Sequence, residues 1–216
     1  TPTKKIIQQP EREQIVMPET IKYDFSFTAT SLRLQEMIMY ANARLNGQEI
    51  DYVRELGKGK AATGIRFNRE FLKRIGKLTD RQVALLAEGD LVSQKQMAFL
   101  AVCKSYGFLR DFVVEVLREK YLLFDHEFND GEFISFWRRK IDLHPDMEDL
   151  TETTQKKIRQ VSYKILEQAG IIENVKSKII QPQLLDTMVT SALVSDDPNW
   201  LKIFLISDMD IKTMIK

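Results

Sequence analysis

The chain has 216 residues, 44% of them hydrophobic and 29% charged, which is the composition of a globular protein large enough to bury a sizeable core. Its formal net charge of +1 excludes a strong overall field towards nucleic acid or anionic membranes, so only local patches could bind such partners. The single cysteine, Cys103, excludes a disulfide framework and indicates a reducing compartment. We therefore expect a cytoplasmic protein.

Residues 1–20 are polar and contain three prolines, which predicts a flexible N-terminal arm that is not a secretory signal. Residues 21–89 are expected to form an N-terminal helical subdomain. In residues 23–28 aromatic and polar side chains alternate, which is typical of a short extended piece. Thr30 or Ser31 is then predicted to cap a first helix that ends at Asn46-Gly47, and three more helices are predicted over residues 49–56, 65–76 and 80–88.

A C-terminal helical subdomain is predicted over residues 90–206, followed by a tail over residues 207–216. Its centre is the longest apolar run of the chain, residues 97–124, in which apolar side chains recur at the spacing of one helix face. Gly107 is expected to separate two core helices as a left-handed cap. Charged residues interrupt this run, which argues against a membrane span.

After the central pair, the sequence predicts a helix over residues 132–143 and a long amphipathic helix over residues 152–169. Two β-prone runs, 171–173 and 178–181, predict a small hairpin. A helix over residues 184–193 and a last strand or extended segment over residues 200–206 complete the chain. The predicted fold class is mainly α: a compact multi-helix protein with a small C-terminal β-hairpin and helix-turn-helix or winged-helix-like elements.

The order of helix, long helix and hairpin is that of a winged helix, which places a recognition helix in the major groove of DNA. The long helix and the predicted wing carry outward side chains that can contact phosphates or a base edge. These candidate nucleic-acid-binding residues are Lys156, Lys157, Arg159, Gln160, Lys164, Lys176 and Lys178. An ordinary solvated helix face is the alternative. The connection over residues 143–150 is also long for a helix-turn-helix.

A second basic patch lies between residues 54 and 81, where nine Lys and Arg oppose three Asp and Glu. Glycines here let backbone N–H groups approach an anion, and the helix that follows adds its positive end. The candidate nucleic-acid-binding residues of this patch are Lys58, Lys60, Arg66, Arg69, Lys73 and Arg74. The glycine spacing fits neither a dinucleotide fingerprint nor the phosphate-binding loop of nucleotidases, which disfavours ATP binding. A solvated basic face is again the alternative.

Catalytic groups are sparse. His126 and His144 lack the i, i+4 spacing of a helical metal site, and Cys103 on a core helix is a poor nucleophile. Four carboxylates within residues 142–149 precede the long helix, where negative charge favours the helix start. A metal-dependent nuclease is an unsupported alternative. We therefore predict a protein that is not an enzyme, with no cofactor and no metal site.

Several segments, in order, are similar to those of one family. They are Tyr-Asp-Phe-Ser-Phe-Thr at 23–28, Phe-Leu-Lys-Arg-Ile at 71–75, Phe-Leu-Ala-Val-Cys-Lys at 99–104, Val-Val-Glu-Val-Leu-Arg-Glu-Lys at 113–120, residues 154–171, and Ile-Gln-Pro at 180–182. From about residue 21 to residue 204 the chain thus resembles BrxA, the small accessory protein of BREX bacteriophage-exclusion systems. The ordered co-occurrence of these segments is more specific than any one of them.

The resemblance implies a component of multi-protein phage defence that works alongside a DNA methyltransferase, an ATPase and a phosphatase-like protein. It also implies likeness to the helical RNA-binding protein NusB. The family's label of inner-membrane protein disagrees with the charge pattern, so we expect no membrane. The first hypothesis is a double-stranded DNA binder that uses both basic patches. The alternatives are a NusB-like RNA binder, or an adaptor for other BREX proteins with an apolar interface around Trp200 and residues 182–193.

Overall fold

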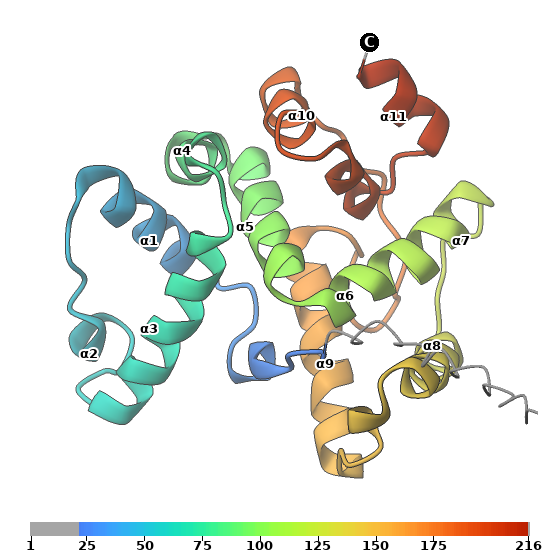
Figure 1. The fold of residues 1–216 in the computed structure, drawn as a ribbon, viewed down its shortest axis with the longest axis horizontal. Coiled ribbons are helices and arrows are strands. Elements are labelled where there is room, and N and C mark those ends of the chain that lie inside the picture. The colour runs from blue at the N-terminus through green and yellow to red at the C-terminus, as the bar shows by residue number, and fades with distance from the viewer. Residues whose placement is uncertain (1–21, 216) are drawn as a thin grey trace, which may run out of the picture.

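Two consecutive helices cross the centre of the molecule, where the sequence has its longest apolar run (Figure 1). The computed structural model describes residues 22–215, and the predicted N-terminal arm over residues 1–20 lies outside them. The predicted pair of core helices is confirmed. The central elements are α5 (Leu91–Ser105), α6 (Gly107–Phe112), a π-helical turn η2 (Val113–Arg118) and α7 (Glu119–Leu122), the last three forming one continuous rod.

The break between α5 and α6 has a different cause from the predicted one. Tyr106 is extended, with φ −133° and ψ 94°, and Gly107 is the first residue of α6 rather than a left-handed cap. A Cβ atom on Gly107 would lie 3.3 Å from Cε1 of Tyr23. A side chain at this position would press on the Tyr23 ring, which packs against the start of α6.

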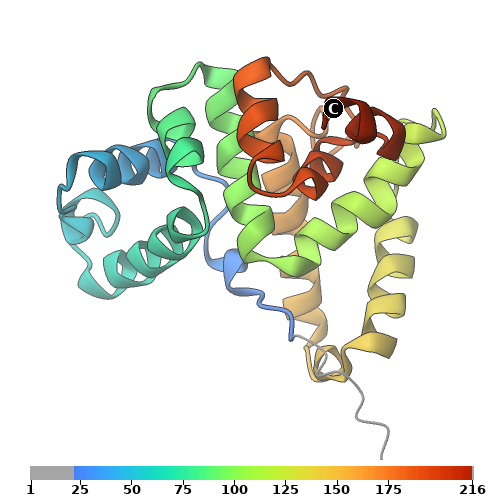
Figure 2. The same ribbon diagram turned by 45° about the horizontal axis from the view of Figure 1, so that its top comes forward.

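The N-terminal helices lie on one side of α5 (Figure 2). They are preceded by a short turn, and the elements are η1 (Ser26–Ala29), α1 (Leu34–Asn46), α2 (Tyr52–Glu55), α3 (Ala61–Gly76) and α4 (Asp80–Glu88). The four predicted helices are present, with shifted ends. The extended piece predicted over residues 23–28 is wrong in its second half, because the Asp24 carboxylate accepts a 2.7 Å hydrogen bond from the Ser26 N–H and starts the η1 turn.

The C-terminal elements are α8 (Asp130–Leu143), η3 (Pro145–Met147), α9 (Glu152–Ala169), α10 (Thr187–Val194), η4 (Pro198–Phe204) and α11 (Asp208–Met214). They pack on several parts of the molecule: α9 contacts α5, α10 contacts α4, and η4 contacts η2. The strand considered for residues 200–206 is wrong: Asp197 caps a 3-10 helix there. In the predicted tail, α11 forms because Ser207 caps it and Asp208 pairs with Arg118 at 3.1 Å.

The predicted β-hairpin is wrong, and the winged-helix interpretation fails with it. Residues 22–215 contain no β-strand, and the two β-prone runs meet only in an isolated antiparallel bridge between Ile172 and Ile180. Lys178 is left-handed, with φ 52°, and its N–H donates to the carbonyl of Asn174 at 3.0 Å. Lys178, the first residue of the predicted second strand, therefore belongs to a turn instead. The N–H of Ile180 donates instead to the carbonyl of His126, at 2.7 Å.

Aromatic side chains fill the junction between α6 and α8. The rings of Phe112 and Phe133 meet edge-on with centroids 5.0 Å apart, and Phe108 and Phe136 meet at 5.3 Å. Cys103 is fully buried in α5, as predicted, and burial raises the pKa of its thiol above the ordinary value. Within residues 22–215, no helix is both long enough and apolar enough to cross a membrane.

Candidate nucleic-acid interface

A cleft with a cavity of about 590 Å³ lies between α3 and α9. Arg66, Arg69 and Lys73 line it from α3, and Lys157 lines it from α9. The η1 turn forms the third side, between the two helices (Figure 1). We call this site the basic cleft. The basic cleft is lined by residues of both predicted basic patches. The sequence alone does not reveal that the two patches meet.

The helical period of α3 explains why its cations share one face. Arg66, Arg69 and Lys73 follow one another at three- and four-residue steps, so they point to the same side of the helix. Phe71 and Ile75 occupy the inner side, where they are 0% and 3% exposed. On α9, Lys157 precedes Ile158, which is fully buried, so core packing fixes the direction in which Lys157 points.

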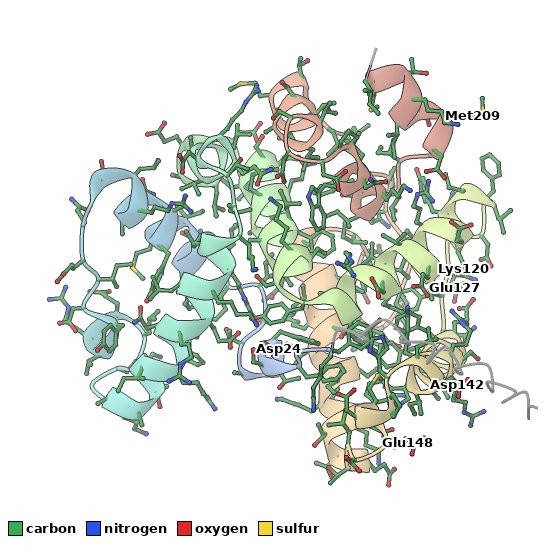
Figure 3. The ribbon with its side chains drawn as sticks, in the orientation of Figure 1. Asp24, Lys120, Glu127, Asp142, Glu148 and Met209 are labelled. Atoms are coloured by element: carbon green, nitrogen blue, oxygen red, sulfur yellow. The ribbon has the colours of Figure 1, made fainter. Side chains whose placement is uncertain are left out.

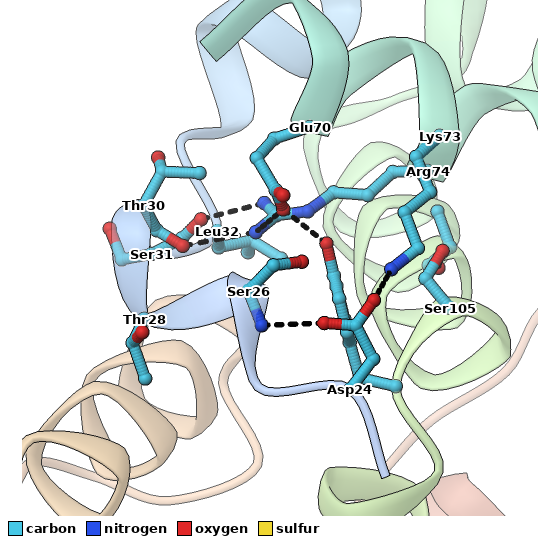
Figure 4. Close-up of polar contacts among 12 residues, drawn as sticks. Asp24, Ser26, Thr28, Thr30, Ser31, Leu32, Glu70, Lys73, Arg74 and Ser105 are labelled. Carbon is cyan, nitrogen blue, oxygen red and sulfur yellow. Dashed lines mark hydrogen bonds and ion pairs between the residues drawn. The ribbon is translucent and has the colours of Figure 1, made fainter. Parts of the chain in front are cut away.

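The segment from Asp24 to Leu32, which we call the strap, joins the two walls of the cleft. Arg74 of α3 donates to the backbone carbonyls of Ser31 at 2.7 Å and Thr30 at 3.0 Å (Figure 4). At the end of the strap, the N–H of Leu32 donates to Oε1 of Gln168, on α9, at 2.9 Å. The strap therefore fixes the position of α3 relative to α9.

Arg74 belongs to a buried polar group that reaches the cleft through Glu70, one of the lining residues. Its side chain is fully buried and lies 4.0 Å from the Glu70 carboxylate, which in turn accepts a hydrogen bond from the hydroxyl of Tyr106. Burial raises the pKa of Tyr106 to about 12, so the hydroxyl stays protonated and can donate. The sequence predicts Arg74 as a phosphate contact, but its buried guanidinium donates its hydrogen bonds to carbonyls within the protein.

Asp24 places a carboxylate at the mouth of the cleft, between α3 and α9 (Figures 3 and 4). It forms an ion pair with Lys73. Partial burial raises the pKa of Asp24, but the hydrogen bonds from Lys73 and from the Ser26 N–H outweigh that effect, so the net pKa lies below the ordinary value of 3.8. Lys73 is thus neutralised by a residue of the strap.

The other cations of the cleft are exposed. Arg66, Arg69 and Lys157 make no ion pair with any residue that the structure describes. Each is exposed to solvent. Three uncompensated positive charges on two facing helices create a local field that attracts polyanions.

In the predicted glycine-rich loop the backbone N–H groups of Gly57, Gly59 and Gly64 donate to carbonyls within the protein. Lys58 and Lys60 are exposed and lie just before α3. A Cβ atom on Gly64 would lie 2.6 Å from the carbonyl oxygen of Tyr52, and one on Gly57 would lie 2.4 Å from that of Lys60. These glycines let α2 pack against the first turn of α3. The two lysines are not among the residues that line the basic cleft.

The other candidate residues of the long helix lie on two different faces. Gln160 and Lys164 follow Lys157 at helical spacing and are exposed, with Lys164 paired to Glu167. Lys156 and Arg159 face α8 instead, outside the basic cleft. Lys156 pairs with Glu152 at 2.7 Å.

Lys178 of the predicted wing and Arg159 of α9 both lie near the start of α8. Asp130 is within 3.6 Å of Arg159 and 3.4 Å of Lys178, so one carboxylate compensates both cations. Lys176 is exposed in the turn that replaces the hairpin. None of these three side chains is among those that line the basic cleft.

The comparisons with known proteins agree on one family. A model of the BrxA family matches residues 21–197 of the chain. A protein of Bacillus cereus (strain H3081.97), named BREX protein BrxA, is 27% identical over 105 residues, which are 49% of this chain and 52% of the relative. The match thus spans about half the length of that curated relative.

The fold is shared more widely than the sequence. A crystal structure of an uncharacterized protein from Magnetospirillum magneticum superimposes with a TM-score of 0.72 at 19% sequence identity. The similarity covers 85% of this chain and 98% of that one. At this identity the similarity concerns the fold alone.

Proposed function

The chain belongs to the BrxA family, and from this premise we propose that it is a BREX phage-defence component that binds double-stranded DNA in the basic cleft without catalysing a reaction. Membership of the BrxA family supports the proposed role in BREX phage defence. The observation that supports DNA binding is the placement of Arg66, Arg69 and Lys157 on two facing helices without ion-pair partners among the described residues.

This arrangement fits the sugar-phosphate backbone better than it fits a base edge. Arginine and lysine side chains neutralise phosphates irrespective of sequence, and most contacts in protein–DNA complexes are of this kind. Gln160 and Lys164 continue the same face of α9, so they extend the surface along the backbone. We therefore expect binding with little base specificity, and no cofactor takes part.

Fluorescence anisotropy with a labelled duplex of arbitrary sequence and a matched RNA hairpin tests the proposal. If three cations each neutralise a phosphate, the slope of log Kobs against log salt concentration is about −3 for the duplex. The double variants Arg66→Glu with Arg69→Glu, and Lys157→Glu with Lys164→Glu, should each lower duplex affinity at least about tenfold.

A matched control carries the same change of charge elsewhere. Arg139→Glu with Lys212→Glu replaces exposed cations on α8 and α11, outside the cleft, and should leave the affinity within about twofold of the wild type. Equal losses in all three variants would contradict the cleft as the site. Preference for the hairpin would favour a NusB-like RNA binder, and absence of binding to both at low salt would favour a protein adaptor.

A further inference from the structure

A second groove, lined by α8 and α9, has a cavity of about 370 Å³. Its α8 side presents Phe133, Ile134, Trp137 and Ile141 at helical spacing. The α9 side presents Glu152, Gln155, Lys156 and Arg159. The groove and the basic cleft use different faces of α9, because Lys157 points to the cleft while Lys156 points to α8.

The floor of this groove is apolar and partly open. Ile134 is 41% exposed although its neighbours on the same face, Phe133 and Trp137, are 3% and 6% exposed. The Nε1–H of Trp137 is buried and has no acceptor in the part of the chain that the structure describes. An apolar ligand side chain would cover the exposed part of Ile134, whereas the buried Nε1–H of Trp137 is out of reach of a ligand in the groove.

The rim is positively charged. Three cations, Arg138, Lys156 and Arg159, line the groove with one carboxylate, Glu152, which pairs with Lys156. Arg159 lies 3.6 Å from Asp130, whereas Arg138 makes no ion pair with a described residue and is exposed. Among the described residues, Arg138 is thus the uncompensated cation of the groove lining, and its charge complement is a carboxylate next to apolar side chains.

We propose that the groove between α8 and α9 binds an acidic amphipathic helix of a protein partner, with apolar side chains on Ile134 and Trp137 and a carboxylate on Arg138. A segment laid along two helices with anchors at i, i+4 and i+7 is a common recognition mode for such a groove. Duplex DNA fits this surface poorly because phosphates gain nothing from an apolar floor. The site is independent of the function proposed for the basic cleft.

Binding in this groove can be measured by the fluorescence of Trp137. The chain has two tryptophans, so in a Trp200→Phe protein the fluorescence comes from Trp137 alone. The probe is a synthetic helical peptide with leucines at i, i+4 and i+7 and glutamates between them, with a lysine-for-glutamate version as its control. We expect saturable change in Trp137 emission with the glutamate peptide and at least about tenfold weaker binding of the lysine peptide.

Matched variants locate the binding. Arg138→Glu and Ile134→Ala should each weaken binding of the acidic peptide about tenfold, with unchanged circular dichroism. Arg139→Glu makes the same charge change at the next residue, which does not line the groove, and should leave the affinity within about twofold of the parent protein. A saturating DNA duplex should not displace the peptide.

Three results would overturn the proposal. The first is that the acidic peptide leaves Trp137 emission unchanged. The second is that Arg139→Glu weakens binding as much as Arg138→Glu, since the attraction would then be diffuse. The third is displacement of the peptide by the duplex, which would assign the groove to the nucleic-acid surface. The DNA proposal is tested separately by the duplex affinity of the cleft variants, so either proposal can fail alone.

Discussion

The guanidinium of Arg74 donates a 2.7 Å hydrogen bond to the backbone carbonyl of Ser31, from a helix to the strap that lies 43 residues earlier in the chain. The same side chain reaches the carbonyl of Thr30 and lies beside the Glu70 carboxylate. A planar fork can satisfy both carbonyls at once, which a lysine ammonium does less well. The shape of the basic cleft thus depends on a cation that does not itself face solvent.

Arg74→Met should destabilise the protein. The change removes both hydrogen bonds to the strap and leaves the Glu70 carboxylate buried without its cation, which costs about 3 kcal/mol in the free energy of unfolding. Urea denaturation followed by circular dichroism measures the loss. Arg69→Met, on the exposed face of the same helix, should change stability by less than about 0.5 kcal/mol. Equal losses in both variants would show that Arg74 has no special part in the fold.

Asp24→Asn should strengthen DNA binding. The wild-type carboxylate pairs with Lys73 and repels phosphates at the mouth of the cleft. Because such a pair at a partly exposed site has a modest energy, we expect duplex affinity to rise about twofold to fivefold. Asp142→Asn makes the same charge change on α8, away from the cleft (Figure 3), and should have no effect. A gain that is equal in both variants would indicate general electrostatics instead.

The sequence predicts the helices well because their apolar period and caps are local properties. The order of α1 to α4 and the two central helices follow from such patterns. The hairpin could not be rejected in this way, since short β-prone runs become strands only if a partner strand and a regular turn exist. The left-handed conformation of Lys178 and the hydrogen bond from Ile180 to His126 depend on the tertiary structure, which the local sequence does not show.

The candidate site is recovered in part. Charge and spacing predict four lining residues of the cleft, Arg66, Arg69, Lys73 and Lys157, but charge alone does not separate them from Arg74. The local sequence does indicate that Arg74 is buried, because it lies between apolar neighbours on the inner face of α3. The roles of Asp24 and Gln168 could not be predicted, since their partners are distant in the sequence.

Two glycines of α3 should respond in opposite directions to alanine. In Gly64→Ala the new Cβ would lie 2.6 Å from the carbonyl oxygen of Tyr52, so α2 has to shift and stability should fall by about 2 kcal/mol. In Gly76→Ala nothing lies within 4 Å of the new atom, and the lower entropy of the unfolded chain should raise stability by about 0.5 kcal/mol. Thermal unfolding of both variants measures these changes. A destabilised Gly76→Ala would contradict the open space at the end of α3.

The burial of Tyr106 should make stability fall at alkaline pH. Burial raises the pKa of Tyr106 from 10.0 to about 12 in the folded protein, so its neutral form is favoured by folding. The corresponding stability is fully present below pH 10 and is lost as the pH rises through about 12. A Tyr106→Phe protein has no proton to lose at this position. Between these pH values the wild type should therefore lose about 2 kcal/mol relative to the variant.

Urea unfolding of the wild type and of Tyr106→Phe, at several pH values from 8 upwards, measures this difference. Tyr40 also has a raised pKa, but it is present in both proteins, so its titration cancels in the comparison. The phenylalanine also removes the donor to Glu70, and this adds a constant difference below pH 10. A difference that stays constant up to the highest pH would mean that Tyr106 ionises alike in the folded and unfolded chains, and that its burial beside Glu70 does not stabilise the neutral form.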